Sequence, residues 1–186
     1  KFLINATSVV GAGAVAGAAV PFLASWQPSA KAEAAGAPAI ADISKLLPGE
    51  MLIVEWRGAP IYIVKHSQES LDQISQNLSR LSDPDSLTDM QPEYARNELR
   101  SRKPGISVLS AVCTHLGCAP KFYPELGTTD FDSNWQGGFF CPCHGSKFDL
   151  AGRVYSGVPA PDNLAIPPHY FRDENILIIG EDGEAV

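Results

Sequence analysis

The chain has 186 residues and a formal net charge of −7, and hydrophobic residues make up 45% of it. This apolar fraction is ordinary for a globular protein, and the length suffices for one domain besides a terminal segment. The acidic balance and the lack of a Lys/Arg run argue against nucleic-acid binding, because neutralising phosphates requires a basic surface.

An uncharged stretch covers residues 2–30. Its apolar core, residues 3–26, would extend roughly 36 Å as a helix, which is enough for a hydrocarbon layer of about 30 Å. We therefore expect a transmembrane anchor over residues 1–27. Because the stretch is rich in Ala and Gly and only weakly hydrophobic, a signal peptide cleaved near residues 30–32 is the alternative.

Small residues in this stretch favour the anchor. Gly13 and Gly17 are four residues apart, a spacing that lets helix backbones approach closely within a membrane. Lys1 precedes the stretch and, by the positive-inside rule, would remain on the cytoplasmic side. The rest of the chain would then lie on the outer side of the membrane.

Residues 28–42 are rich in Ala, Gly and Pro, a composition that predicts a linker. The remaining residues, 43–186, are sufficient for one head domain. Two strand-like runs are joined by a short turn and predict a hairpin, and three further short strands follow. These runs are residues 51–56, 60–64, 106–112, 138–140 and 176–179. The pattern is typical of a mainly antiparallel β protein.

Two helices are expected between the hairpin and the next strand. Ser67 is a candidate N-cap for a helix whose apolar face would carry Leu71, Ile74, Leu78 and Leu81. Residues 91–102 predict a second, looser helix.

Two short stretches hold every cysteine of the chain and two of its four histidines. Residues 113–118 read CTHLGC and residues 141–146 read CPCHGS, and each stretch follows a predicted strand. The first contains a C-x-H pair and the second a C-x2-H pair. The other histidines, His66 and His169, have no partner cysteine, and we expect them at the surface.

These pairs resemble iron–sulfur ligands more than zinc ligands. Structural zinc sites normally use C-x2-4-C with H-x3-5-H or four cysteines, whereas here Cys and His are interleaved. A Rieske-type [2Fe-2S] centre has two thiolates on one iron and two imidazoles on the other, which one Cys and one His from each stretch would supply. Structural zinc and a domain held by disulfides alone are the alternatives.

The two motifs resemble those of the Rieske iron-sulfur subunits of quinol:cytochrome c oxidoreductases. The resemblance is tightest over residues 103–170, moderate over 42–103 and only general in the anchor. It implies an antiparallel β-sandwich head with a cluster-binding part at about residues 111–162, holding one [2Fe-2S] cluster. The polar insertion at residues 81–103 is similar to that of proteobacterial and mitochondrial members.

The resemblance implies a role for each cysteine and histidine of the two stretches. The implied iron ligands are Cys113, His115, Cys141 and His144. The remaining cysteines, Cys118 and Cys143, would close a disulfide over the cluster, as an oxidising compartment permits. Both histidine ligands would also accept a proton, because electron gain by the cluster raises their basicity.

Residues around the ligands complete the implied site. Leu116 and Pro142 would form an apolar collar around the cluster, and the Ser146 hydroxyl would donate to a bridging sulfide. The resemblance therefore implies that Leu116 and Ser146 are cofactor-binding residues. Residues 157–161, GVPAP, resemble a lid that two prolines stiffen. Phe148 stands where the family often has Tyr, so we expect a lower reduction potential than in Tyr-bearing relatives.

The implied function is one-electron transfer. The chain would take an electron and a proton from ubiquinol at a cytochrome b subunit and pass the electron to a cytochrome c-type haem subunit of a dimeric respiratory complex. The head would lie on the periplasmic side of the inner membrane, with residues 28–42 as a hinge, and residues 1–3 resemble the end of a twin-arginine signal. The alternative is a soluble or periplasmic Rieske component of another oxidoreductase, such as arsenite oxidase or an oxygenase.

Overall fold

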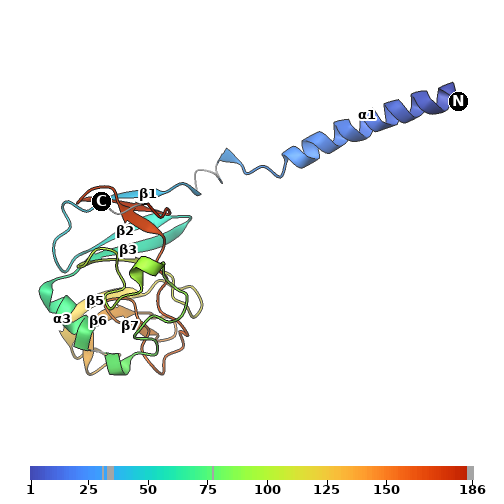
Figure 1. Ribbon diagram of the computed structural model, residues 1–186. Helices are drawn as coiled ribbons and strands as arrows, with labels where there is room; N and C mark the ends of the chain where they lie inside the picture. Colours follow the sequence, from blue (N-terminus) through green and yellow to red (C-terminus); the bar gives the residue numbers. More distant parts are fainter. Residues whose placement is uncertain (31, 33–35, 77, 184–186) are drawn as a thin grey trace. The chain divides into compact units, whose positions relative to one another are not determined.

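The computed structural model describes residues 1–30, 32, 36–76 and 78–183. The chain divides into two compact units, Lys1–Gly36 and Ala37–Val186. Figure 1 shows a long helix in the first unit and a β-rich second unit, the head.

The first unit contains helix α1, Phe2–Ala24. Among the described residues it is the one helix long and apolar enough to cross a membrane, with a mean hydropathy of 1.7. Its 23 residues correspond to a length of about 34 Å. The Thr7 hydroxyl donates to the Leu3 carbonyl at 2.8 Å, so this polar side chain is satisfied within the helix itself. The helix lies inside the expected anchor.

Within its described residues the head contains three antiparallel sheets of three strands each, which confirms the mainly antiparallel β class. The first sheet has the order β1 (Ala39–Asp42), β9 (Ile176–Ile179), β8 (His169–Phe171). The second has the order β2 (Met51–Trp56), β3 (Ala59–Lys65), β4 (Ile106–Ser110). The third has the order β5 (Lys121–Gly127), β6 (Trp135–Phe140), β7 (Lys147–Phe148).

Strand β3 belongs to two hydrophobic cores at once. Ile61 and Ile63 pack into a core shared with β1, β8 and β9, whereas Tyr62 and Val64 pack into a second core shared with β6 and β7. Because successive side chains of a strand point to opposite faces, the continuous apolar sequence of β3 is buried on both sides. The second sheet therefore lies between the other two, as Figure 1 shows.

The predicted hairpin is confirmed. Trp56 pairs with Ala59 in the antiparallel register of β2 and β3, which leaves Arg57 and Gly58 as a two-residue turn. Both turn residues have positive φ, 53° and 73°, as the twist of a tight hairpin requires.

The first predicted helix is shorter than expected. Helix α3 covers Gln68–Gln76, and Ser67 caps it, since its hydroxyl accepts the Ser70 N–H at 3.2 Å. Leu78 belongs instead to a 3-10 turn, η1 (Leu78–Arg80), and Leu81 packs into an aromatic cluster against the third sheet. The expectation of one apolar helical face reaching Leu81 was wrong, because tertiary packing redirects the chain there.

The second predicted helix, residues 91–102, is also wrong. Of these residues only the 3-10 turn η2 (Glu93–Ala95) is helical. The side chain of Asn97 bonds to the backbone of three neighbouring residues, which competes with helical hydrogen bonds. Arg100 has a φ of 48°, outside the helical range.

The expected linker overlaps the head domain. Of residues 28–42, residues 31 and 33–35 lie outside the described part of the chain, and Ala39–Asp42 form β1, paired with β9. Ala41 is the buried residue of this strand, so an Ala-rich composition concealed it. The last three residues of the predicted head, 184–186, also lie outside the described residues.

His66 and His169 are buried, so the expectation of surface positions was wrong. His66 Nε2 lies 2.7 Å from the Ser107 hydroxyl, and His169 Nδ1 lies 2.8 Å from the Pro167 carbonyl. These partners allow neutral rings to be buried. Burial lowers the pKa of each ring to about 4.

Candidate metal centre

The first cysteine stretch forms a closed loop that two residues separate from the end of β4. The Cys113 N–H donates to the Cys118 carbonyl and the Gly117 N–H donates to the Cys113 carbonyl, both at 2.9 Å. Gly117 has a φ of +84°, a conformation that favours glycine. The Thr114 hydroxyl donates to the Asp162 carbonyl at 2.6 Å and so ties the loop to a later part of the chain.

The second cysteine stretch closes in the same way after β6. The Cys141 N–H donates to the Ser146 carbonyl at 2.8 Å, and the Gly145 N–H donates to the Cys141 carbonyl at 2.9 Å. Gly145 has a φ of +79°. Both loops therefore begin with a cysteine shortly after a strand, continue through a glycine at the fifth position and close at the sixth.

A disulfide joins the two loops. It links Cys118 with Cys143, whose Cα atoms lie 6.6 Å apart, and this is the pairing that the family resemblance implied. The other two cysteines, Cys113 and Cys141, are free and buried. Each loop thus contributes one cysteine to the disulfide and retains one thiol.

The surroundings of Cys113 shift the pKa of its thiol in both directions. Burial raises the pKa of the Cys113 thiol and the neighbouring Cys141 thiol raises it further, whereas the His115 backbone N–H and the Ser146 hydroxyl lower it. A thiol must lose its proton to bind a metal. The N–H and hydroxyl donors would therefore stabilise the form of Cys113 that a metal requires.

The two histidines of the loops lie side by side. The ring centroids of His115 and His144 are 4.7 Å apart, and the rings are nearly perpendicular at 89°. His115 Nδ1 is buried without a hydrogen-bond partner. Buried polar atoms normally have a partner, so this nitrogen is suited to a metal. Two buried free thiols and two adjacent imidazoles are the donor set of a Rieske cluster.

Ser146 connects the second loop with the proline-containing loop, residues 157–161. Ser146 is fully buried, and its oxygen accepts the Ala160 N–H at 3.0 Å. Leu116 and Pro142 differ from it: Leu116 is 71% exposed and Pro142 is also exposed. The loops therefore bury the Ser146 hydroxyl and expose two apolar side chains, Leu116 and Pro142.

Phe148 of β7 lies in the core that contains the two free cysteines. It is fully buried, pairs with Phe139 across β6 and β7, and packs in the same cluster as Cys113 and Cys141. A longer side chain at position 148 would extend within this cluster.

One buried residue near the site was missed by the sequence analysis. The Arg100 side chain is fully buried, and its guanidinium donates to the carbonyls of Ala151 and Leu164 and to the Gln91 side chain at 2.9–3.0 Å. Leu164 belongs to the core of the free cysteines. Arg100 therefore joins the insertion to the cluster-binding part, and its place in a polar segment gave no sign of this.

Comparison with protein families identifies the head. The family model of the Rieske [2Fe-2S] domain matches residues 37–168. The chain belongs to the Rieske [2Fe-2S] family. A second family model, described as the ubiquitinol-cytochrome C reductase Fe-S subunit TAT signal, matches residues 1–29 of this Rieske chain.

Named relatives cover nearly the whole Rieske chain. It is 53% identical to the ubiquinol-cytochrome c reductase iron-sulfur subunit of Allochromatium vinosum over 182 residues, which are 98% of this chain and 88% of the relative. The subunit of the same name from Blastochloris viridis is 42% identical over 179 residues, 96% of this chain and 90% of the relative. These matches confirm the expected family of Rieske subunits.

A solved structure supports the fold. A chain of a hyperthermophilic respiratory Complex III aligns with a TM-score of 0.50 at 23% identity, covering 92% of the Rieske chain and 98% of that chain. The Rieske domain match also confirms [2Fe-2S] as the cofactor expected from the sequence, in place of structural zinc or a disulfide-only domain.

Proposed function

We propose that this chain is the electron-carrying subunit of a ubiquinol:cytochrome c reductase, with one [2Fe-2S] cluster between its two loops. The proposed iron ligands are Cys113, His115, Cys141 and His144. The observation that carries this proposal is the contact of the His115 and His144 rings, 4.7 Å apart, on the two loops that also hold the free, buried Cys113 and Cys141.

When bound, the cluster supplies one-electron chemistry at about −150 to +300 mV, far above the roughly −400 mV of plant-type ferredoxins. The chain would add a proton site: if His115 Nδ1, which is buried without a hydrogen-bond partner, holds the iron, Nε2 of the same ring would hold the proton. His144 is exposed and can meet a quinol hydroxyl directly. The exposed Leu116 and Pro142 offer an apolar surface to the quinone pocket of a partner.

The relatives and helix α1 support the proposed partners and location. The relatives are named as subunits of ubiquinol-cytochrome c reductase, so we propose a cytochrome b subunit, a cytochrome c-type haem subunit and ubiquinol as partners in a dimeric complex. Helix α1 would span the inner membrane, with lipid around it. A periplasmic head fits its disulfide, because disulfides persist in oxidising compartments.

We further propose a hinge between the anchor and the head. The division of the chain at residues 36 and 37 supports it, since each side forms its own compact unit. Such a hinge would let the head move between the quinol pocket and the haem partner.

The test uses the full chain extracted from membranes in mild detergent. We expect iron and labile sulfide in equal amounts, and two nitrogen couplings in pulsed paramagnetic resonance of the reduced protein. Those couplings should come from histidine when only histidine carries ¹⁵N. A sample without labile sulfide, or a reduced centre with no nitrogen coupling, would refute the ligand set.

Copurification with b-type and c-type haem polypeptides tests the assignment to a reductase. If these polypeptides do not copurify with the chain from intact membranes, the assignment is overturned.

A further inference from the structure

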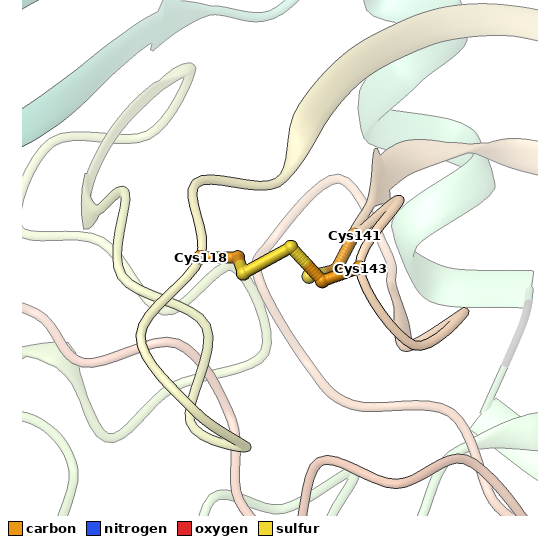
Figure 2. Close-up of side chains that lie close together, drawn as sticks. All are labelled: Cys118, Cys141 and Cys143. Carbon is orange, nitrogen blue, oxygen red and sulfur yellow. A yellow bond between two sulfur atoms is a disulfide. The ribbon is translucent and has the colours of Figure 1, made fainter.

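Three sulfur atoms lie close together at the disulfide that links the two loops. The Sγ atoms of Cys118, Cys141 and Cys143 all lie within 4.8 Å of one another, and Figure 2 shows the Cys141 side chain beside the disulfide. Two of these sulfurs form the disulfide, whereas Cys141 carries a free thiol. Thiol–disulfide exchange begins with such a neighbour, because a thiolate attacks a sulfur of the disulfide.

We propose that Cys141 exchanges with this disulfide in the protein that lacks its cluster. The Cys141 thiolate attacks Cys118 Sγ, the Cys118–Cys143 bond breaks, and a Cys118–Cys141 bond forms. Cys143 leaves as a thiolate and takes up the proton that Cys141 lost. Among these three sulfurs, one disulfide and one thiol are present before and after the step, so no oxidant or reductant is needed.

The geometry favours attack on Cys118 over attack on Cys143. Attack on Cys143 would close a disulfide across the single residue Pro142, within one loop, whereas attack on Cys118 keeps the two loops joined. The thiol released by attack on Cys118 is that of Cys143, an exposed residue, whereas Cys141 is buried. Solvation of the released thiol favours the exchanged pairing. Cys113 lies outside the three-sulfur group, so Cys141 is the free thiol placed to attack the disulfide.

The exchange has a consequence for cluster loading. The exchanged chain has its Cys141 sulfur in a disulfide, so it can no longer offer that sulfur to iron. Conversely, iron bound to Cys141 would remove the attacking thiol and preserve the native disulfide. This protective effect rests on the proposed ligand role of Cys141, whereas exchange in the metal-free chain does not.

Alkylation of the folded, metal-free full chain in detergent micelles tests the exchange. Iodoacetamide is added under native conditions, and the protein is then unfolded, digested without reduction and fragmented in a mass spectrometer. Cleavage between Cys141 and Pro142 distinguishes a label on Cys141 from a label on Cys143. We expect label on Cys143, together with a Cys118–Cys141 linked peptide. Label on Cys141 with an intact Cys118–Cys143 link would overturn the proposal.

Two variants form a matched pair. Cys113→Ser and Cys141→Ser each remove one buried free thiol and one proposed ligand, but only Cys113→Ser keeps the attacking sulfur. We expect Cys143 to be labelled in Cys113→Ser and unlabelled in Cys141→Ser, with equal circular dichroism showing that both are folded. Equal labelling of Cys143 in both variants, or none in either, contradicts the exchange.

The cluster-loaded wild-type chain separates the two proposals. If Cys141 binds iron, Cys143 stays unlabelled there. If the loaded chain is labelled at Cys143 as strongly as the metal-free chain, the ligand role of Cys141 fails while the exchange itself stands.

Discussion

The Ala160 N–H donates to the Ser146 hydroxyl oxygen at 3.0 Å. Because this bond occupies the oxygen as an acceptor, the hydroxyl hydrogen remains available to donate. The Ser146 hydroxyl is one of the groups that lower the pKa of the Cys113 thiol, so it stabilises negative charge at that sulfur. The proline-containing loop thereby orients a donor toward the proposed cluster.

Ser146→Ala should lower the midpoint potential of the cluster. The hydrogen bond from Ser146 should stabilise the reduced, more negative cluster by about 1.4 kcal/mol more than the oxidised one. Losing this difference lowers the midpoint potential by about 60 mV for a one-electron couple. Redox titration followed by paramagnetic resonance measures the shift. Ser156→Ala, at an exposed serine of the same part of the chain, is the control and should leave the potential unchanged. An unaltered potential in Ser146→Ala would show that the hydroxyl does not act on the cluster.

Phe148→Tyr should raise the midpoint potential. Phe148 packs in the same core as Cys113 and Cys141, so a phenol hydroxyl at this position can donate to a ligand sulfur. The expected rise is at most about 60 mV, equivalent to one such bond. Phe131→Tyr adds a hydroxyl outside this core, in the cluster of Leu81, Trp135 and Tyr155, and is the matched control. If the midpoint of Phe148→Tyr fails to rise above the wild-type value, the missing phenol is not the reason for a low potential.

Arg100→Met should destabilise the head by about 3 kcal/mol, because it leaves buried acceptors without a donor. These acceptors are the carbonyls of Ala151 and Leu164 and the side chain of Gln91. Urea unfolding followed by circular dichroism measures the loss. Arg96→Met removes a surface ion pair with Asp89 and should change stability by less than about 1 kcal/mol. Equal stabilities of the two variants would mean that the Arg100 contacts contribute nothing.

The stability of the head should fall as the pH is lowered from 6.5 to about 4. The pKa of His66 and of His169 is lowered to about 4 by burial, below the value of 6.5 of an unperturbed ring. Between these pH values the unfolded chain binds more protons than the folded one, so the stabilisation is complete above pH 6.5 and is lost toward pH 4. The loss amounts to about 3 kcal/mol per ring.

His169→Phe tests this dependence. The variant removes one titrating ring, so its unfolding free energy should change less between pH 7 and pH 4 than that of the wild type, even if it is less stable at pH 7. Urea unfolding at four pH values in this range measures both slopes. If the unfolding free energy of the variant and of the wild type depends on pH with the same slope, the acid sensitivity comes from carboxylates and not from His169.

Sequence reasoning succeeded where the determining signal is local. The hairpin at residues 51–65 was predictable because two strand-like runs flank a tight turn, and the Ser67 cap because it precedes the helix directly. It failed at residues 91–102, where Asn97 binds the neighbouring backbone and tertiary contacts hold Arg100. It also missed β1, because a strand that buries only an alanine resembles a linker in composition.

By itself, the sequence determined the kind of chemistry. Two cysteine–histidine stretches fix which donor atoms are available, and an uncharged stretch of sufficient length defines a candidate membrane helix. Only the tertiary structure decided which atoms meet: the His115 and His144 rings, the burial of Arg100, His66 and His169, and the position of Cys141 beside the disulfide. Donor identity is a property of each residue, whereas proximity depends on how three sheets pack and on where each strand ends.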